Sequence, residues 1–100
     1  MPRLNMATAH TLGETEALRR LKDKFSVVRD AYQAQISELH EEWNGSTLEF
    51  AFKAVGMKVA GQLTVADAEV RLAADLPLAA MMFKKVIQQQ IHAKLGELLA

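Results

Sequence analysis

The sequence predicts a single α+β domain in which an antiparallel sheet packs against an N-terminal and a C-terminal amphipathic helix. Apolar and polar residues alternate along the middle of the chain, as they do in strands with one buried face. Near both ends, apolar residues recur every three or four positions, as they do in helices that bury one side. The order β-α-β-β-β-β-α over residues 1–100 buries all these apolar sides most economically as two layers.

The first strand is expected at residues 3–10, with Leu4, Met6 and Thr8 on one side. After it, Thr11 and Glu14 have the spacing of a capping box, in which each side chain accepts a hydrogen bond from the other residue's backbone N–H. The amphipathic helix that follows is predicted over residues 12–34. Its inward stripe consists of Leu18, Leu21, Phe25, Val28 and Tyr32.

The stretch from Gln33 to Trp43 fits either a longer helix or a strand. Asn44-Gly45 favours the strand, because this pair is preferred at the centre of a type I′ hairpin turn, which needs a strand on each side. We therefore expect strands at 37–43 and 47–54, the second turning Leu48, Phe50 and Phe52 inward. Where the helix ends and the strand begins stays open.

Two more alternating runs, 57–65 and 69–76, predict strands separated by a turn at 66–68. Gly61 is expected to let the sheet bend or to let a helix approach closely. Pro77 ends the last strand and suits the opening of a helix. The residues expected to point inward from the C-terminal helix are Phe83, Val86, Ile87, Ile91, Leu95, Leu98 and Leu99.

Composition excludes several classes of function. The formal net charge is zero, so no overall field draws in nucleic acid or an anionic membrane. The absence of cysteine removes disulfides, thiolate chemistry and cysteine-ligated metals. No apolar run approaches the roughly 20 residues of a membrane span, and Met1 to Asn5 lacks the apolar stretch of a signal peptide. We expect a cytoplasmic protein with no transmembrane segment, no nucleic-acid partner and no cofactor.

Residues that could hold a metal or a phosphate are present but are not grouped for it. His10, His40 and His92 fall in different elements, without a second histidine at metal-ligand spacing, and are expected to be solvated. The run from Gly56 to Gly61 has the glycine spacing of a phosphate loop, but the Lys-Ser/Thr pair that should follow is missing. The sequence therefore predicts no metal site and no phosphate loop.

An acidic cluster is the other candidate for chemistry. Catalytic carboxylates need unequal environments, whereas alternation places Glu38 and Glu42 on the solvated side. Glu41 falls on the inner side, which favours an edge position or a local bulge. A hydrolase acting through Glu41 or His40 is a third reading, but the sequence favours a protein that is not an enzyme and has no catalytic residues.

One stretch stands out because it is apolar on all sides. Residues 76–83 open a helix that should be only half buried, and Val55-Gly56-Met57 is expected at the same end of the sheet. Methionine-rich surfaces adapt to loose hydrophobic partners, and exposed apolar patches often mark interfaces. Core packing is the favoured interpretation, and dimerisation with a second copy or attachment to a lipid-like or polymer surface are the alternatives. The candidate interaction residues are Met57, Leu78, Met81, Met82 and Phe83.

Several motifs, taken in order, resemble the polyhydroxyalkanoic acid system proteins, also called the granule-region family. They are His10-Thr11-Leu12-Gly13 with Glu16-Ala17, Trp43-x-Gly45-x-x-Leu48-x-Phe50, Gly61-x-Leu63-x-Val65, and Glu69-Val70-x-Leu72 leading into Leu76. The resemblance spans nearly the whole chain. It implies a bacterial, non-enzymatic accessory protein that associates with polyhydroxyalkanoate granules or with granule proteins, and it assigns no catalytic or ligand-binding residue.

The predicted arrangement is also similar to a reduced helix-grip fold, in which a curved antiparallel sheet holds a long C-terminal helix. This similarity implies an alternative function: a small module that binds a lipid or acyl ligand between the sheet and the C-terminal helix. Because a shared fold does not establish a shared site, the alternative depends on whether a cavity is present there.

Overall fold

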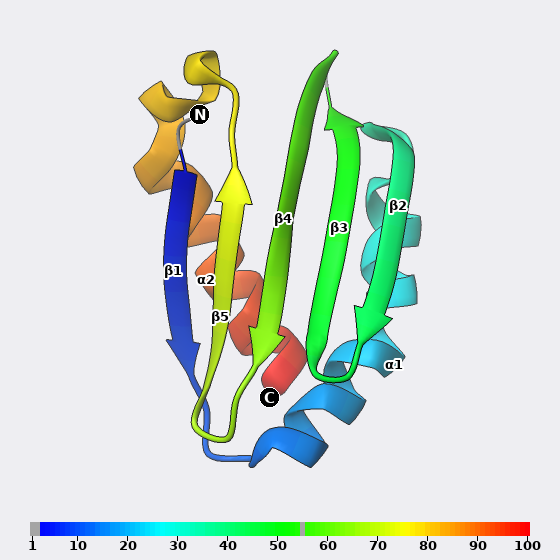
Figure 1. Cartoon of the computed structure of the whole chain (residues 1–100), viewed down its shortest axis with the longest axis vertical. Helices are drawn as coiled ribbons and strands as arrows, with labels where there is room; N and C mark the ends of the chain where they lie inside the picture. Colours follow the sequence, from blue (N-terminus) through cyan, green and yellow to red (C-terminus); the bar gives the residue numbers. More distant parts are fainter. Residues whose placement is uncertain (1–2, 55) are drawn as a thin grey trace.

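Five strands form one antiparallel sheet in the order β1-β5-β4-β3-β2 (Figure 1). The strands are β1 (Arg3–Ala9), β2 (Ile36–Asn44), β3 (Thr47–Ala54), β4 (Met57–Val65) and β5 (Glu69–Asp75). The helices are α1 (Glu14–Tyr32), the short 3₁₀ helix η1 (Leu78–Phe83) and α2 (Lys84–Leu99). This computed structural model describes residues 3–54 and 56–100, and it confirms the predicted fold class and element order.

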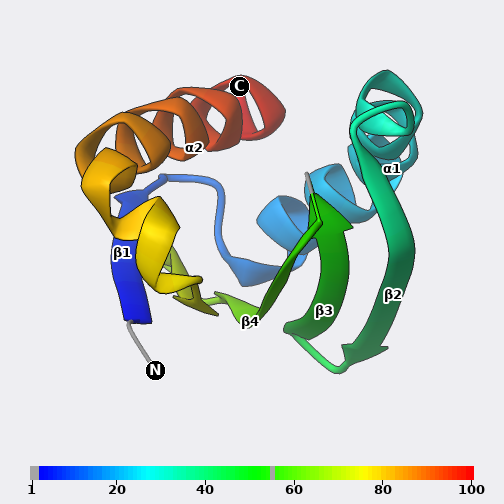
Figure 2. The same cartoon turned by 90° about the horizontal axis from the view of Figure 1, so that it is seen from above.

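Both long helices lie on the same face of the sheet, which we call the inner face (Figure 2). α2 runs over the side formed by β1 and β5, and α1 runs over the side formed by β2 and β3. The buried sheet residues all belong to this inner face, as the strand register requires. They are Leu4, Thr8, Leu48, Leu63, Val65, Val70, Leu72 and Ala74.

The densest part of the core lies where the start of α1 meets the end of α2. Ala17 and Leu21 of α1 are fully buried there against the last two turns of α2 and the sheet. An Arg20 side-chain nitrogen donates to the backbone carbonyl of Leu99 at 2.9 Å, which joins the two helices. From this point the helices diverge toward the other end of the sheet (Figure 1), where Phe52 is only half buried.

The hairpin of β2 and β3 follows the prediction, but its turn is displaced by one residue. Asn44 pairs with Thr47, so the two turn residues are Gly45 and Ser46. Gly45 has φ 61° and stands first in the turn, which fits the glycine-first type II′ class. The start of β2 contains a bulge between Ser37 and His40. The extra residue shifts the alternation of side chains along the strand, which explains why the stretch from Gln33 to Trp43 fitted both a helical and a strand period.

The predicted capping box at the start of α1 is wrong. The helix begins at Glu14, its N-cap residue is Gly13, and no side chain of the cap residue bonds the helix end. Thr11 is therefore two positions too early to cap. The backbone N–H of Glu14 instead donates to a carboxylate oxygen of Asp67 at 3.2 Å, so the turn between β4 and β5 supplies the acceptor.

Gly61 does allow a close approach, but its neighbour is a strand and not a helix. A Cβ atom at this position would lie 2.4 Å from the carbonyl oxygen of Ala73 and 2.8 Å from the Cα of Ala74. Both atoms belong to the backbone of β5, which pairs with β4. Only glycine therefore lets these two strands pack as they do.

Three residues predicted to point inward are exposed: Tyr32, Phe83 and Val86. Phe83 still belongs to η1, because α2 begins only at Lys84. Val86 lies on α2 but precedes Ile91 by five residues, which places it about 140° away around the helix axis. The inward side of α2 consists of Ile87, Ile91, Leu95, Leu98 and Leu99, all half buried or buried.

Within the described ranges, no helix combines the length and the hydropathy of a membrane span.

Candidate functional site

Large apolar side chains are exposed at the end of the molecule where η1 lies, the upper end in Figure 1. We call five of them the apolar end surface: Leu78 (78% exposed), Met82 (84%), Phe83 (59%), Val86 (50%) and Met57 (36%). Four come from η1 and the first turn of α2, and Met57 comes from the start of β4. Exposed apolar residues that lie at one end of a molecule often mark an interaction site.

The path of the chain after β5 explains this exposure. Leu76 is still buried, and Pro77 then leads the chain off the end of the strand with an extended backbone (φ −59°, ψ 148°). η1 follows, closed by a hydrogen bond from the backbone N–H of Ala80 to the carbonyl of Pro77. Because η1 lies beyond the end of β5 (Figure 1), its side chains have no inner sheet face to pack against.

The structure places four of the five sequence-predicted candidates, Met57, Leu78, Met82 and Phe83, at the exposed surface. Met81 is half buried. Core packing, the favoured interpretation of this stretch, is therefore wrong for these four residues, because η1 lies beyond the end of β5. Val86 was missed, although its position on the helix, away from Ile91, was a usable signal. Val55 lies outside the described residues.

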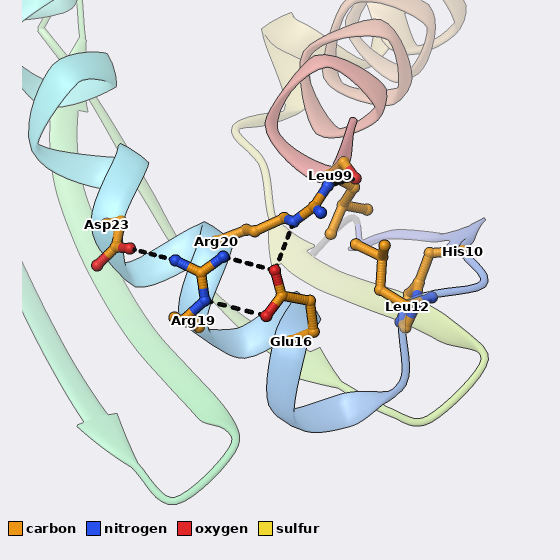
Figure 3. Close-up of polar contacts among 7 residues, drawn as sticks. All are labelled: His10, Leu12, Glu16, Arg19, Arg20, Asp23 and Leu99. Atoms are coloured by element: carbon orange, nitrogen blue, oxygen red, sulfur yellow. Dashed lines mark hydrogen bonds and ion pairs between the residues drawn. The ribbon is translucent and has the colours of Figure 1, made fainter.

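The most strongly perturbed carboxylate, Glu16, has a structural role (Figure 3). Hydrogen bonds from Arg19 and Arg20 lower the pKa of Glu16 from 4.5 to about 2. A carboxyl group with such a low pKa remains ionised near neutral pH, so it is poorly suited to proton transfer. Arg19 also contacts Asp23, and Arg20 reaches the end of α2, so the group braces α1 against α2.

Two of the three histidines make hydrogen bonds that join elements of the fold, and the expectation of a solvated side chain is wrong for the half-buried His10, whereas His40 and His92 are exposed. The backbone N–H of Leu12 donates to Nδ1 of His10 at 3.2 Å, which leaves the proton on Nε2. Nε2 then donates to the carbonyl of Ala66 at 2.9 Å, tying the β1–α1 loop to the β4–β5 turn. His92 of α2 hydrogen-bonds the buried Thr8 of β1 through Nδ1 at 3.0 Å.

The acidic residues of β2 do not converge with a histidine. Glu41 is half buried on an edge strand near the bulge, as the sequence indicated, and its carboxylate lies 2.8 Å from Arg29 of α1. Its neighbour His40 is exposed and, by strand alternation, points to the other face of the sheet. Among residues 3–54 and 56–100, no three His, Asp or Glu side chains are grouped so that they could hold a metal ion.

Two open surface hollows lie close to the sheet. One is on its outer face and is lined by residues of β1, β4 and β5, among them Asn5, Gln62 and Arg71. The other lies beside the end of α1 and the start of β2, near Asp30 and Leu39. Neither hollow lies between the sheet and α2, where the helix-grip alternative would place an acyl ligand.

These observations define a small two-layer α+β protein with an exposed apolar end, in which His10, Glu16 and His92 make contacts that join elements of the fold. The family model described as "putative polyhydroxyalkanoic acid system protein" matches residues 4–99, and the chain belongs to this family. The resemblance inferred from the motifs is thereby confirmed. Searches among curated proteins and among solved structures found no match.

The motifs that pointed to the family turn out to specify the fold. His10 ties two loops together, and Gly61 permits the close approach of β5. Trp43 pairs with Leu48 across the hairpin and packs against Phe25 of α1, with ring centroids 6.1 Å apart. The apolar end surface lies outside these motifs, although it lies within residues 4–99, which the family model matches.

Proposed function

We propose that this protein is a non-enzymatic accessory protein of the polyhydroxyalkanoate system, attaching to polymer granules or to granule proteins through its apolar end surface. The family supplies the link to the polymer system. The observation that carries the mode of action is the group of large apolar side chains exposed around η1. A polyester presents alkyl groups and uncharged ester carbonyls, so its surface suits apolar side chains better than water does.

The exposed side chains are large enough to hold the protein on an apolar surface when they are buried against it. Leu78 and Met82 each leave more than three quarters of their surface in water. Burying a side chain of this size fully contributes about 1.5–3 kcal/mol. Methionine also adapts its shape to an irregular surface, because its unbranched side chain rotates about three bonds. A few such contacts together are enough for reversible binding without any specific pocket.

The arrangement of reactive groups supports a role without catalysis. Within the described residues, His10 and His92 are engaged in hydrogen bonds that join elements of the fold. Glu16 is ionised and paired with two arginines, and Glu41 is paired with Arg29. An active site instead brings a nucleophile, base or metal together beside a substrate pocket.

Fractionation of cells tests the proposal. In cells that make the polymer, we expect the protein in the granule fraction, and in cells that do not, in the soluble fraction. The double variant Leu78→Ser/Met82→Ser should return to the soluble fraction even when polymer is present, because it loses the most exposed apolar groups. The control Val27→Ser removes an exposed apolar side chain on α1 and should stay with the granules. Equal solubility of the wild type in both cells contradicts the proposal.

One observation bears on an acyl ligand bound on the inner face, although it concerns β3 and not the region beneath α2 where the helix-grip alternative places the ligand. Phe50 and Phe52 stack with ring centroids 6.2 Å apart, and both are only half buried on the inner face. Titration with a medium-chain fatty acid, followed by the fluorescence of Trp43, tests this reading. Equimolar saturable binding that survives Leu78→Ser/Met82→Ser supports it, whereas an unchanged signal excludes it.

A further inference from the structure

The lysines around the apolar end surface lack acidic partners, whereas Asp75 at the end of β5 and Glu38 near the start of β2 are paired with Arg3 and Lys53. The chain contains no Asp or Glu from residue 76 to residue 96, which covers η1 and most of α2. Lys84 and Lys85 open α2 immediately after η1, and Lys58 stands second in β4, at the same end of the molecule (Figure 1). Within the described part of the chain, these three lysines take part in no ion pair with a carboxylate.

Four carboxylates without a cationic partner lie at the opposite end, whereas Asp30, which also lacks one among the described residues, lies near the end of α1. Glu14 and Asp67 lie where β1 leads into α1 and where β4 turns into β5. Glu42 and Glu49 face each other across β2 and β3, two residue pairs from the Asn44–Thr47 pair that closes the hairpin turn. None of the ion pairs among residues 3–54 and 56–100 includes these four carboxylates. The zero net charge therefore conceals a basic apolar end and an acidic opposite end.

We infer that the apolar end surface docks on a phospholipid layer that carries anionic headgroups. The inference rests on the proposed function in that it uses the same surface, and it names the partner as lipid. Exposed apolar side chains bordered by lysines are the combination that binds such layers, because the apolar groups enter the acyl boundary while the ammonium groups reach the phosphates. The lysine charge is complementary to the headgroups.

The charge separation also orients the protein on the layer. An anionic surface attracts the end that carries Lys58, Lys84 and Lys85 and repels the end that carries Glu14 and Asp67. Leu78 and Met82, the most exposed residues of the chain's apolar end, then face the acyl region. The expectation that no overall field attracts an anionic membrane was based on the net charge alone. The distribution of charge in the fold instead favours binding to an anionic membrane through the basic end.

A second copy of the chain fits the same surface less well. In a two-fold symmetric contact, each subunit presents the same patch to the other. Such a contact through η1 would bring Lys58, Lys84 and Lys85 of both copies together with no carboxylate from residues 76–96 to offset them. Anionic headgroups remove this repulsion, whereas a second copy adds to it.

Co-sedimentation of the full chain with vesicles tests the inference. We expect clear binding to phosphatidylcholine vesicles doped with phosphatidylglycerol and weak binding to pure phosphatidylcholine, with the difference fading as salt is raised. Each lysine near an anionic surface contributes about 1 kcal/mol, so Lys84→Gln/Lys85→Gln should weaken binding to the doped vesicles roughly thirtyfold. The matched control Lys22→Gln/Lys24→Gln removes the same charge from α1, and its affinity should change far less.

Lipid-free particles of the polymer separate this inference from the proposed function. Binding to the doped vesicles but not to the bare particles supports the lipid inference and contradicts direct attachment to polymer. Binding to the particles alone, unaffected by Lys84→Gln/Lys85→Gln, overturns the lipid inference and leaves the proposed function standing. Three other results would also overturn the lipid inference. They are equal binding to both kinds of vesicle, equal losses of affinity in both lysine variants, and a dimer formed through Leu78 and Met82 without lipid binding.

Discussion

Replacing Gly61 with alanine should destabilise the protein by packing alone. The new methyl group would lie 2.4 Å from a backbone oxygen of Ala73 and 2.8 Å from the Cα of Ala74. These atoms belong to the paired strand β5, so they cannot rotate away as a flexible side chain does. Overpacking of this kind costs about 1–3 kcal/mol. For a domain of this size, each kcal/mol lowers Tm by about 4–8 °C, so Gly61→Ala should lower it by roughly 5–20 °C.

Gly96→Ala is the matched control, and its effect should have the opposite sign. Gly96 lies within α2, is exposed, and has no atom within 4 Å of the position of the added methyl. Alanine in a helix interior is about 0.5–1 kcal/mol more favourable than glycine. Thermal unfolding followed by circular dichroism measures both variants. If Gly61→Ala is as stable as the wild type, the added methyl does not overpack against β5. If Gly96→Ala is less stable than the wild type, alanine is not favoured over glycine at this position of α2.

Two further predictions concern the hydrogen bonds of His10 and the ion pairs of Glu16. His10→Ala leaves the N–H of Leu12 and the carbonyl of Ala66 without their partner, and it should cost about 1–3 kcal/mol in urea unfolding, whereas the exposed His40→Ala should cost almost nothing. Because the folded protein lowers the pKa of Glu16 from 4.5 to about 2, its ion pairs stabilise the fold above pH 4.5 and lose this effect as the pH falls toward 2. Glu16→Gln should therefore have a lower Tm than the wild type at neutral pH, and the two values should converge across that window. A constant difference between them would contradict the assignment.

The strands and helices were predictable because side-chain periodicity alone places them. Residues 57–65 and 69–75 alternate cleanly, and the structure has strands there with Leu63 and Val70 buried. What periodicity misses is contact between distant segments. The cap on Glu14 comes from Asp67, which is 53 residues away, and His10 bonds Ala66 across a similar separation. No local pattern contains this information.

The candidate surface was predictable in composition but not in exposure. The apolar run at 76–83 has the same composition whether it fills a core or faces water. Its exposure depends on whether the sheet extends beneath these residues. Leu76 is buried because β5 has only just ended, and Leu78 is exposed because η1 has passed beyond the sheet. The separation of charge between the two ends was likewise hidden, because it depends on the direction of each strand.

The most direct test of the account is partition of the purified protein onto lipid-free polyhydroxyalkanoate particles. The variant Leu78→Ser/Met82→Ser/Phe83→Ser removes the three most exposed residues of the apolar end surface, while Val27→Ser/Tyr32→Ser removes exposed apolar groups from α1. Since each buried side chain contributes about 1.5–3 kcal/mol and about 1.4 kcal/mol is tenfold, the first variant should bind more than about a hundredfold more weakly than the wild type, and the second should bind like it. Unchanged binding by the first variant, or an equal loss in both, would contradict attachment through the apolar end.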